Sequence, residues 1–331
     1  MVRMSTRLEN AVTAENEYTA EQLNSEKPPR GHRLNRKKRK LIFIVVMLAL
    51  PLIQLFIFWF LVNVNTIIMA FQEFDWSSGK YIFNGFDNFI RVFREIGGES
   101  AVTRRAVINS VLYFPVTCFI SLPLSILFSY FLYKKVPGSA AFRVIFFLPS
   151  IIPVAVLTMT FSFSFDATLG FVNPILRALG VDHIPSWFGQ YPNNQIMIFA
   201  YCIWAGLGTN IVLISGAISR IPVEIMEYSK LEGVSKAREL FQIAIPLVWP
   251  TISTTFVLGC TSVFTVMMQP LMVTPGSSDT QTIALMIYNG VLNGRNLPYL
   301  SAFGLAMSVI GVPIILVIKW AMGKPFADVE Y

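Results

Sequence analysis

The sequence predicts an all-α membrane protein with six transmembrane helices. The composition is 54% hydrophobic and only 14% charged, whereas soluble domains carry about 25% charged residues. The charges are also segregated, because long runs contain no Asp, Glu, Lys or Arg, and each reaches the roughly 17–25 residues that a helix needs to cross the hydrocarbon. No run shows the period-two alternation of a transmembrane strand. The predicted spans are 41–71, 107–133, 144–165, 195–219, 247–273 and 301–322, and the charge-free run within the last of them is 301–318.

The basic segment 27–40 predicts the orientation of these spans. It holds eight Lys or Arg and no acid, and it accounts for the net charge of +7. Such a cluster beside a first helix stays in the cytoplasm, where it is less suited to nucleic acid than to a membrane surface. We therefore expect a polar cytoplasmic tail over 1–40, a membrane domain over 41–325 and a cytoplasmic C-terminus. The basic loop 134–143 and the insert 220–246 then fall on the cytoplasmic side as well.

The segment 86–96 is expected to form an amphipathic helix at the outer interface. Four arginines in the outer segment 72–106 that contains it weaken the charge rule on that side: Arg91, Arg94, Arg104 and Arg105. Its apolar residues recur at helical spacing, namely Phe86, Phe89, Ile90, Phe93 and Ile96.

The charge-free runs offer little acid, base or metal chemistry. They contain no Asp, Glu, His, Lys or Arg, the groups that ion-coupled carriers place within the bilayer. The three cysteines lie inside apolar runs without metal-ligand spacing, so we expect no catalytic, cofactor or metal site. Neutral polar groups remain, and they either bond across helix interfaces or bind a hydroxyl-rich ligand. Trp204 and Phe264 are suited to stacking against sugar rings.

The insert 221–246, IPVEIMEYSKLEGVSKARELFQIAIP, carries the signals of two short helices. Pro222 suits a first helical turn, Gly233 suits a left-handed helix end, and Ser235 suits a helix cap. An ordered insert of mixed charge suggests a docking surface. The first helix carries an apolar stripe at spacings of four, three and three, formed by Ile221, Ile225, Tyr228 and Leu231.

The same insert resembles the EAA loop of permease subunits in binding-protein-dependent ABC importers. Glu227-Tyr228-Ser229, Gly233 and Ile243-Ala244-Ile245-Pro246 fall at the spacing of that motif. Tyr228 and Ser229 replace two alanines, Glu232 stands for the usual Asp, and Ile245 replaces Leu. NGFDNF at 84–89, Asn109-Ser110, FFLPSIIP at 146–153, Trp204, TPG at 274–276 and Phe303-Gly304 are similar to the carbohydrate, maltose-transporter-like branch. The resemblance covers roughly 41–325.

The resemblance implies a type I ABC importer transmembrane fold in a bacterial or archaeal cytoplasmic membrane. It implies a second, homologous permease subunit, two ATPase subunits that bind ATP and Mg, and an extracytoplasmic solute-binding protein that delivers a carbohydrate. This chain would be a non-catalytic transport subunit with no cofactor of its own. The residues implied in ATPase coupling are Ile225, Glu227, Tyr228, Leu231 and Gly233. Those implied in the substrate pathway are Gly206, Thr209, Thr261, Ser262 and Thr265.

Other functions stay open at this point. An ion-coupled secondary carrier would transport from this chain alone, and a membrane scaffold would not transport at all. An importer for a polyol or glycerol phosphate is a further alternative, although a phosphate ligand favours Arg or Lys in the pathway and the charge-free runs have none. Neither the sugar nor the permease subunit that carries its main contacts is identified by the sequence.

Overall fold

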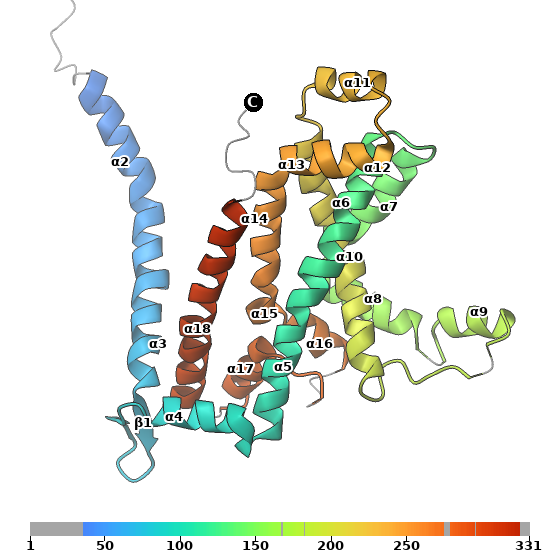
Figure 1. Ribbon diagram of the computed structural model, residues 1–331. Helices are drawn as coiled ribbons and strands as arrows, with labels where there is room; N and C mark the ends of the chain where they lie inside the picture. Colours follow the sequence, from blue (N-terminus) through green and yellow to red (C-terminus); the bar gives the residue numbers. More distant parts are fainter. Residues whose placement is uncertain (1–35, 167, 182, 275–278, 295, 325–331) are drawn as a thin grey trace, which may run out of the picture. The chain divides into compact units, whose positions relative to one another are not determined.

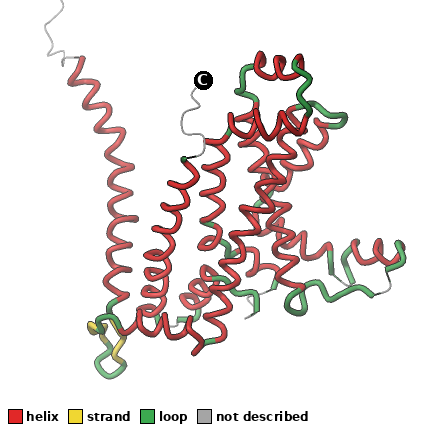
Figure 2. The backbone as a smooth tube through the Cα atoms, viewed as in Figure 1, coloured by secondary structure: helices red, strands yellow, loops and turns green. Residues whose placement is uncertain are grey.

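The computed structural model describes residues 36–166, 168–181, 183–274, 279–294 and 296–324, and the chain divides into two units, 1–64 and 65–331. Most of the predicted tail 1–40 and the last two residues of the TPG segment lie outside the described residues. Helices dominate both units (Figure 2).

The first predicted span forms within a continuous helix, Lys37–Ala70, that is 34 residues long and apolar enough to cross a membrane. Pro51 lies inside it, and the turns that follow are π-helical. Proline removes one backbone N–H from the hydrogen-bond ladder, and wider turns of this kind occur where the ladder is disturbed. The parts of this helix are α2 (Arg36–Gln54), η1 (Leu55–Leu61) and α3 (Val62–Ala70).

Three more helices in the second unit are long and apolar enough to span a membrane: Ala101–Tyr133, Asn193–Ile218 and Leu297–Gly323. The last two are α10 and α18. The first comprises α5 (Ala101–Pro115), η3 (Val116–Ser121) and α6 (Leu122–Tyr133). Helix α10 packs along α6 (Figure 1).

The predicted span 144–165 is broken in the structure. Helices α7 (Ser139–Ile151) and α8 (Val154–Ser164) meet at an angle of 112°. Ile152 has an extended backbone, with ψ at 135°, because the ring of Pro153 disfavours the helical conformation in the residue before it. Among the described residues the count is therefore four helices long and apolar enough to span a membrane, or up to six spans if each of two bent pairs is one span.

The second bent pair contains the predicted span 247–273. Lys236–Leu247 and Trp249–Thr265 meet at 78°, and Val266 then leaves the helical conformation. The predicted span therefore ends at Thr265, and a separate helix, α16 (Met268–Val273), packs against α8. The elements of the pair are α12 (Lys236–Glu239), η4 (Leu240–Ala244), α13 (Ile245–Leu247), α14 (Trp249–Cys260) and α15 (Ser262–Thr265).

The second unit has two distinct ends (Figure 1). We call one the insert end, because α11 (Val223–Leu231) and α12 lie there. The opposite end carries an antiparallel hairpin, which hydropathy does not predict, and α4, the core of the expected amphipathic helix. Asn88 of α4 donates to the carbonyls of Ala70 and Gln72 and so fixes this corner. The elements here are β1 (Gln72–Asp75), β2 (Lys80–Phe83), α4 (Asp87–Arg94), η2 (Glu95–Glu99), α9 (Val172–Ala178) and α17 (Ile283–Leu292).

Separate apolar cores hold these ends. The core at the insert end joins α6, α10 and α11 to the start of the bent pair, and the core at the opposite end joins α4, α5 and α17 to α18. Each end therefore has its own packing, and the spanning helices connect the two.

Candidate coupling surface and transport pathway

The two-helix insert forms as the sequence predicts. Gly233 has a φ of +69°, the left-handed conformation in which glycine ends a helix without strain. The Ser235 hydroxyl accepts the backbone N–H of Arg238 at 3.4 Å and caps α12. Pro222 lies one position earlier than expected, since its ψ of 131° makes it the residue that precedes the helix.

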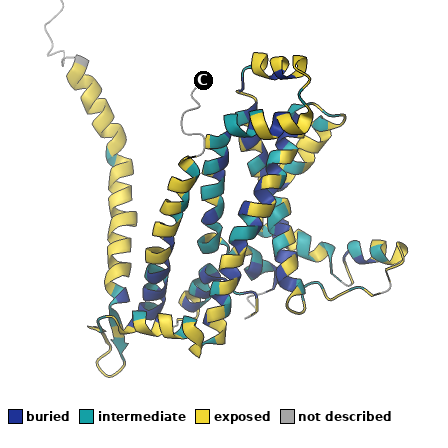
Figure 3. Cartoon of the chain, in the orientation of Figure 1, coloured by how far each residue is buried: buried dark blue, intermediate teal, exposed yellow. Residues whose placement is uncertain are grey.

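One face of α11 is apolar and exposed (Figure 3). The side chains of Ile225, Tyr228 and Leu231 are 37%, 66% and 85% exposed. We call these three residues the coupling stripe. Met226 on the opposite face is buried in the core of the insert end. Ile221 does not join the stripe as predicted, because it precedes the helix and packs into that same core.

Part of the coupling stripe lines a shallow groove. Ile225 and Tyr228 form one wall with Glu224, and Val234 and Ile243 come from beyond the turn. Glu227 is exposed on the same helix. The structure thus places all five predicted coupling residues on one exposed helix and the glycine turn that ends it.

Buried contacts fix the second helix of the insert, and sequence reasoning does not predict them. Glu239 is buried and forms an ion pair with Lys134, which directly follows α6. The Tyr130 hydroxyl donates to the carbonyl of Lys236 at 3.1 Å. In the sequence, the basic loop 134–143 and Glu239 are both expected on the cytoplasmic side, but nothing indicates that Lys134 and Glu239 pair.

Two of the predicted pathway residues meet the π-helical segment η3. The hydroxyls of Ser262 and Thr117 are 3.0 Å apart. A Cβ added at Gly206 would lie 3.6 Å from the Ser121 hydroxyl. Helices α10 and α15 therefore bring their small and polar residues to one short stretch of the second span, in the middle of otherwise apolar helices.

The other three pathway residues lie differently. Thr209 and Thr265 are exposed, and Thr261 is half-buried. The hydroxyls of Thr261 and Thr265 donate to carbonyls of their own helix, those of Leu258 and Thr261. The protons of these two hydroxyls are used within the helix, so a ligand could bond to them only by donating to the oxygen lone pairs that remain.

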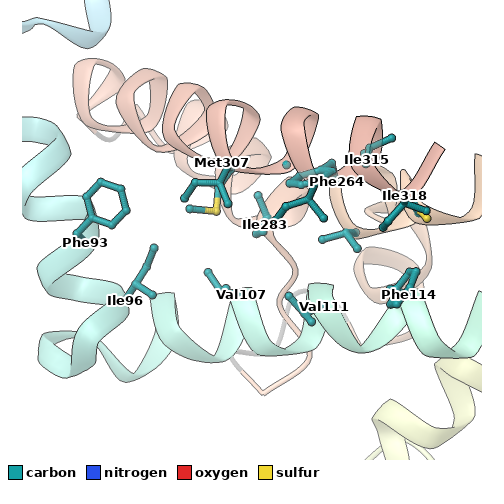
Figure 4. Close-up of a pocket in the computed structure, with 15 residues that line it drawn as sticks. Phe93, Ile96, Val107, Val111, Phe114, Phe264, Ile283, Met307, Ile315 and Ile318 are labelled. Atoms are coloured by element: carbon teal, nitrogen blue, oxygen red, sulfur yellow. The ribbon is translucent and has the colours of Figure 1, made fainter. Parts of the chain in front are cut away.

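The two aromatic residues suited to sugar stacking are in different surroundings. Trp204 is 39% exposed and stacks on Phe161 at 6.0 Å. Phe264 lines an apolar cavity of about 360 Å³ together with Val111 and Met307 (Figure 4). An added Cβ at Gly311 would lie only 2.2 Å from the ring of Phe264, so this ring packs against α18 on one side, and Trp204 is the more exposed of the two.

A polar cluster at the opposite end ties α18 to α4. Tyr299 and Thr103 donate to the carboxylate of Glu95 at 2.6 and 2.9 Å, and Arg91 pairs with it at 2.9 Å. Burial raises the pKa of Glu95, but the hydrogen bonds from Tyr299, Arg91 and Thr103 outweigh that effect and lower the pKa below its usual range. The carboxylate therefore stays charged and holds three elements together.

The described residues contain no group of three or more His, Cys, Asp or Glu that could hold a metal ion. The predicted pathway residues offer neutral groups, namely the hydroxyls of four Thr or Ser residues and one glycine.

Comparison with known proteins decides the family. Residues 121–323, more than half of the chain, match the model of the "Binding-protein-dependent transport system inner membrane component" family. The chain belongs to this family. It is accordingly a multi-pass membrane protein and a non-catalytic transport subunit.

Individual relatives of this permease agree with the family. The "Probable ABC transporter permease protein YurN" of Bacillus subtilis (strain 168) is 26% identical over 259 residues, which is 76% of this chain and 86% of YurN. The diacetylchitobiose uptake permease NgcF of Streptomyces coelicolor is 24% identical over 85% of this chain and 83% of its own. A chain in the crystal structure of a bacterial ABC transporter that imports alginate matches with a TM-score of 0.75 at 21% identity, over 87% of this permease and 97% of that chain. The last match establishes the shared type I importer fold.

Proposed function

We propose that this permease forms half of the translocation pathway of an ATP-driven carbohydrate importer in the cytoplasmic membrane. A second permease would supply the other half, two ATPase subunits would bind at the insert end, and a solute-binding protein would deliver the sugar at the opposite end. The N- and C-termini would then be cytoplasmic. The permease itself binds neither ATP nor Mg.

The observation that carries the proposal is the coupling stripe. Three apolar side chains, Ile225, Tyr228 and Leu231, are exposed on a helix whose other face is buried. An exposed apolar patch bordered by charge marks a protein interaction site. The charged residues around the stripe carry both signs, namely Glu224, Glu227, Lys230 and Glu232, and such charge suits a soluble protein partner rather than lipid.

The carbohydrate part of the proposal is supported by the pathway chemistry and by the relatives. The polar groups at η3 are the neutral hydroxyls of Thr117, Ser121 and Ser262, and Trp204 offers an exposed ring. Neutral hydroxyls and aromatic faces match a hydroxyl-rich, uncharged ligand. Relatives named for diacetylchitobiose and multiple sugars are consistent with this class.

Purification of the native complex through this subunit tests the proposal. We expect an ATPase, a second permease and ATP hydrolysis that rises when the solute-binding protein and its oligosaccharide are added. A panel of oligosaccharides, with a polyol and glycerol phosphate as comparisons, then identifies the ligand class. Ion-driven uptake by this chain alone in liposomes, without an ATPase partner, would contradict the proposal.

A further inference from the structure

The insert is held to the second span by side chains that the coupling stripe does not use. Lys134 and Glu239 form an ion pair, and the Tyr130 hydroxyl bonds the carbonyl of Lys236 at 3.1 Å. Tyr130 lies in the last turn of α6 and Lys134 follows that helix, whereas both of their partners belong to α12. The stripe lies on the other helix of the insert, α11, so this contact serves a different purpose.

The contact is built to persist. The side chains of Lys134 and Glu239 are only 16% and 3% exposed, and the Tyr130 ring is fully buried. Separation of a buried ion pair leaves two desolvated charges without compensation. The two groups therefore stay together unless water enters, and α12 follows the end of α6 when either of them moves.

Helix α12 is connected to two membrane helices, one through the backbone and one through this side-chain contact. From α12 the backbone runs through η4 and α13 into α14 and then α15, so the insert is joined covalently to the stretch Trp249–Thr265, which carries Ser262. The side-chain contact joins α12 to the end of Ala101–Tyr133, the helix that carries Thr117 and Ser121. A displacement of the insert thus reaches both helices that meet at the polar segment η3.

We propose that the Lys134–Glu239 ion pair, together with the Tyr130–Lys236 hydrogen bond, is a positioning device that transmits motion of the insert to the second span. This inference rests on the proposed function, because the motion would come from ATPase subunits seated on the coupling stripe. Lys134, Glu239 and Tyr130 are positioning residues, since they act through the helices that they join and touch neither ATP nor sugar.

The test measures coupling in the purified complex with its partner permease, ATPases and solute-binding protein. ATP is the probe, and the readout is the ratio of ATP hydrolysis with and without the solute-binding protein, which is purified with the sugar it retains. The informative variant removes both charges, Lys134→Met with Glu239→Gln, because this leaves no unpaired buried charge. Lys135→Gln removes an exposed charge from the same loop and is the matched control.

The neutral pair is expected to keep ATPase in the complex and to keep basal hydrolysis, while the stimulation ratio falls about tenfold, within the usual range of coupling between sites. The exchanged pair, Lys134→Glu with Glu239→Lys, should regain stimulation, and Lys135→Gln should match the wild type. If the ion pair only stabilised the fold, the neutral pair would keep both assembly and stimulation.

Full stimulation of the neutral pair would overturn the inference. If the neutral pair does not assemble, the exchanged pair decides: recovered stimulation supports the device, and absent stimulation contradicts it. A wild-type complex that does not respond to the solute-binding protein would instead contradict the proposed function, and this distinguishes the two failures.

Discussion

Thr117 and Ser262 share a hydrogen bond between the second and fifth predicted spans, with 3.0 Å between Oγ1 and Oγ. The Thr117 hydroxyl also lies within hydrogen-bond reach of the carbonyl of Tyr113 in its own helix, and either hydroxyl of the pair can be the donor. Thr117 lies within the π-helical turns that follow Pro115, so the bond is a contact between two neutral polar groups at this irregular segment. Irregular turns of this kind recur at functional sites, and here they lie where two spans meet.

Loss of the Ser262 hydroxyl tests that contact. We expect Ser262→Ala to lower the stability of the permease by about 0.6 kcal/mol, the average for polar contacts between membrane helices. Thr265→Val, at an exposed site with a local hydrogen bond, is the comparison and should cost less. Thermal unfolding in detergent measures both, and equal costs would argue that the bond between helices adds nothing.

Close packing of α10 on α7 predicts that Gly208 tolerates no side chain. An added Cβ would lie 2.4 Å from the carbonyl oxygen of Phe146, a backbone atom that cannot rotate away. Gly208→Ala should therefore destabilise the permease by about 1–3 kcal/mol, as overpacking does. Gly216→Ala in the same helix meets nothing within 4 Å and should be neutral or stabilising. A melting temperature unchanged by Gly208→Ala would contradict this packing.

The turn of the insert depends on Gly233. Nothing lies within 4 Å of an added Cβ, but φ is +69°, so the cost of Gly233→Ala is conformational, about 1–2 kcal/mol. Asn tolerates this conformation better, so Gly233→Asn should be milder. The amount of ATPase retained by the purified permease is expected to follow the order Gly, Asn, Ala. Equal retention by all three would show that the turn does not set the docking geometry.

The hydrogen-bonded cluster around Glu95 predicts that the stability of the permease depends on pH. Its pKa is lower in the folded protein than the ordinary 4.5, so its stabilising effect is fully present above that value and is lost as the pH falls through the lowered pKa. Glu95→Gln should be less stable than the wild type at neutral pH, and the difference should shrink in acid. Unfolding curves from pH 7 down to about pH 3 measure it, and a difference independent of pH would contradict the lowered pKa.

Local patterns in the sequence predict the insert well. Gly233 and Ser235 act within a few residues of themselves, so their conformations can be inferred without knowledge of the rest of the fold. Hydropathy likewise finds the apolar runs. Hydropathy does not show where the backbone bends within an apolar run. For this reason the predicted span 144–165 is bent at Ile152 in the structure, and the predicted span 247–273 is broken after Thr265.

Contacts between distant segments could not be predicted. The pairing of Lys134 with Glu239 depends on how α6 and α12 meet, and many exposed charges in the same loops look alike in sequence. Phe264 likewise faces an apolar cavity rather than a polar one because of its position on α15 against Gly311. In both cases the sequence gives the type of residue, but it does not show which residue packs against it.

The most direct test of the central claim is a photo-cross-link from the coupling stripe. A photo-reactive phenylalanine analogue at Leu231, which is 85% exposed, should form a covalent adduct with the ATPase in the assembled complex. The same analogue at Thr168, an exposed residue beyond the end of α8 away from the insert, should not. Adducts of the Leu231 variant with lipid or permease alone, in a complex that still hydrolyses ATP, would contradict the assignment of this helix as the ATPase seat.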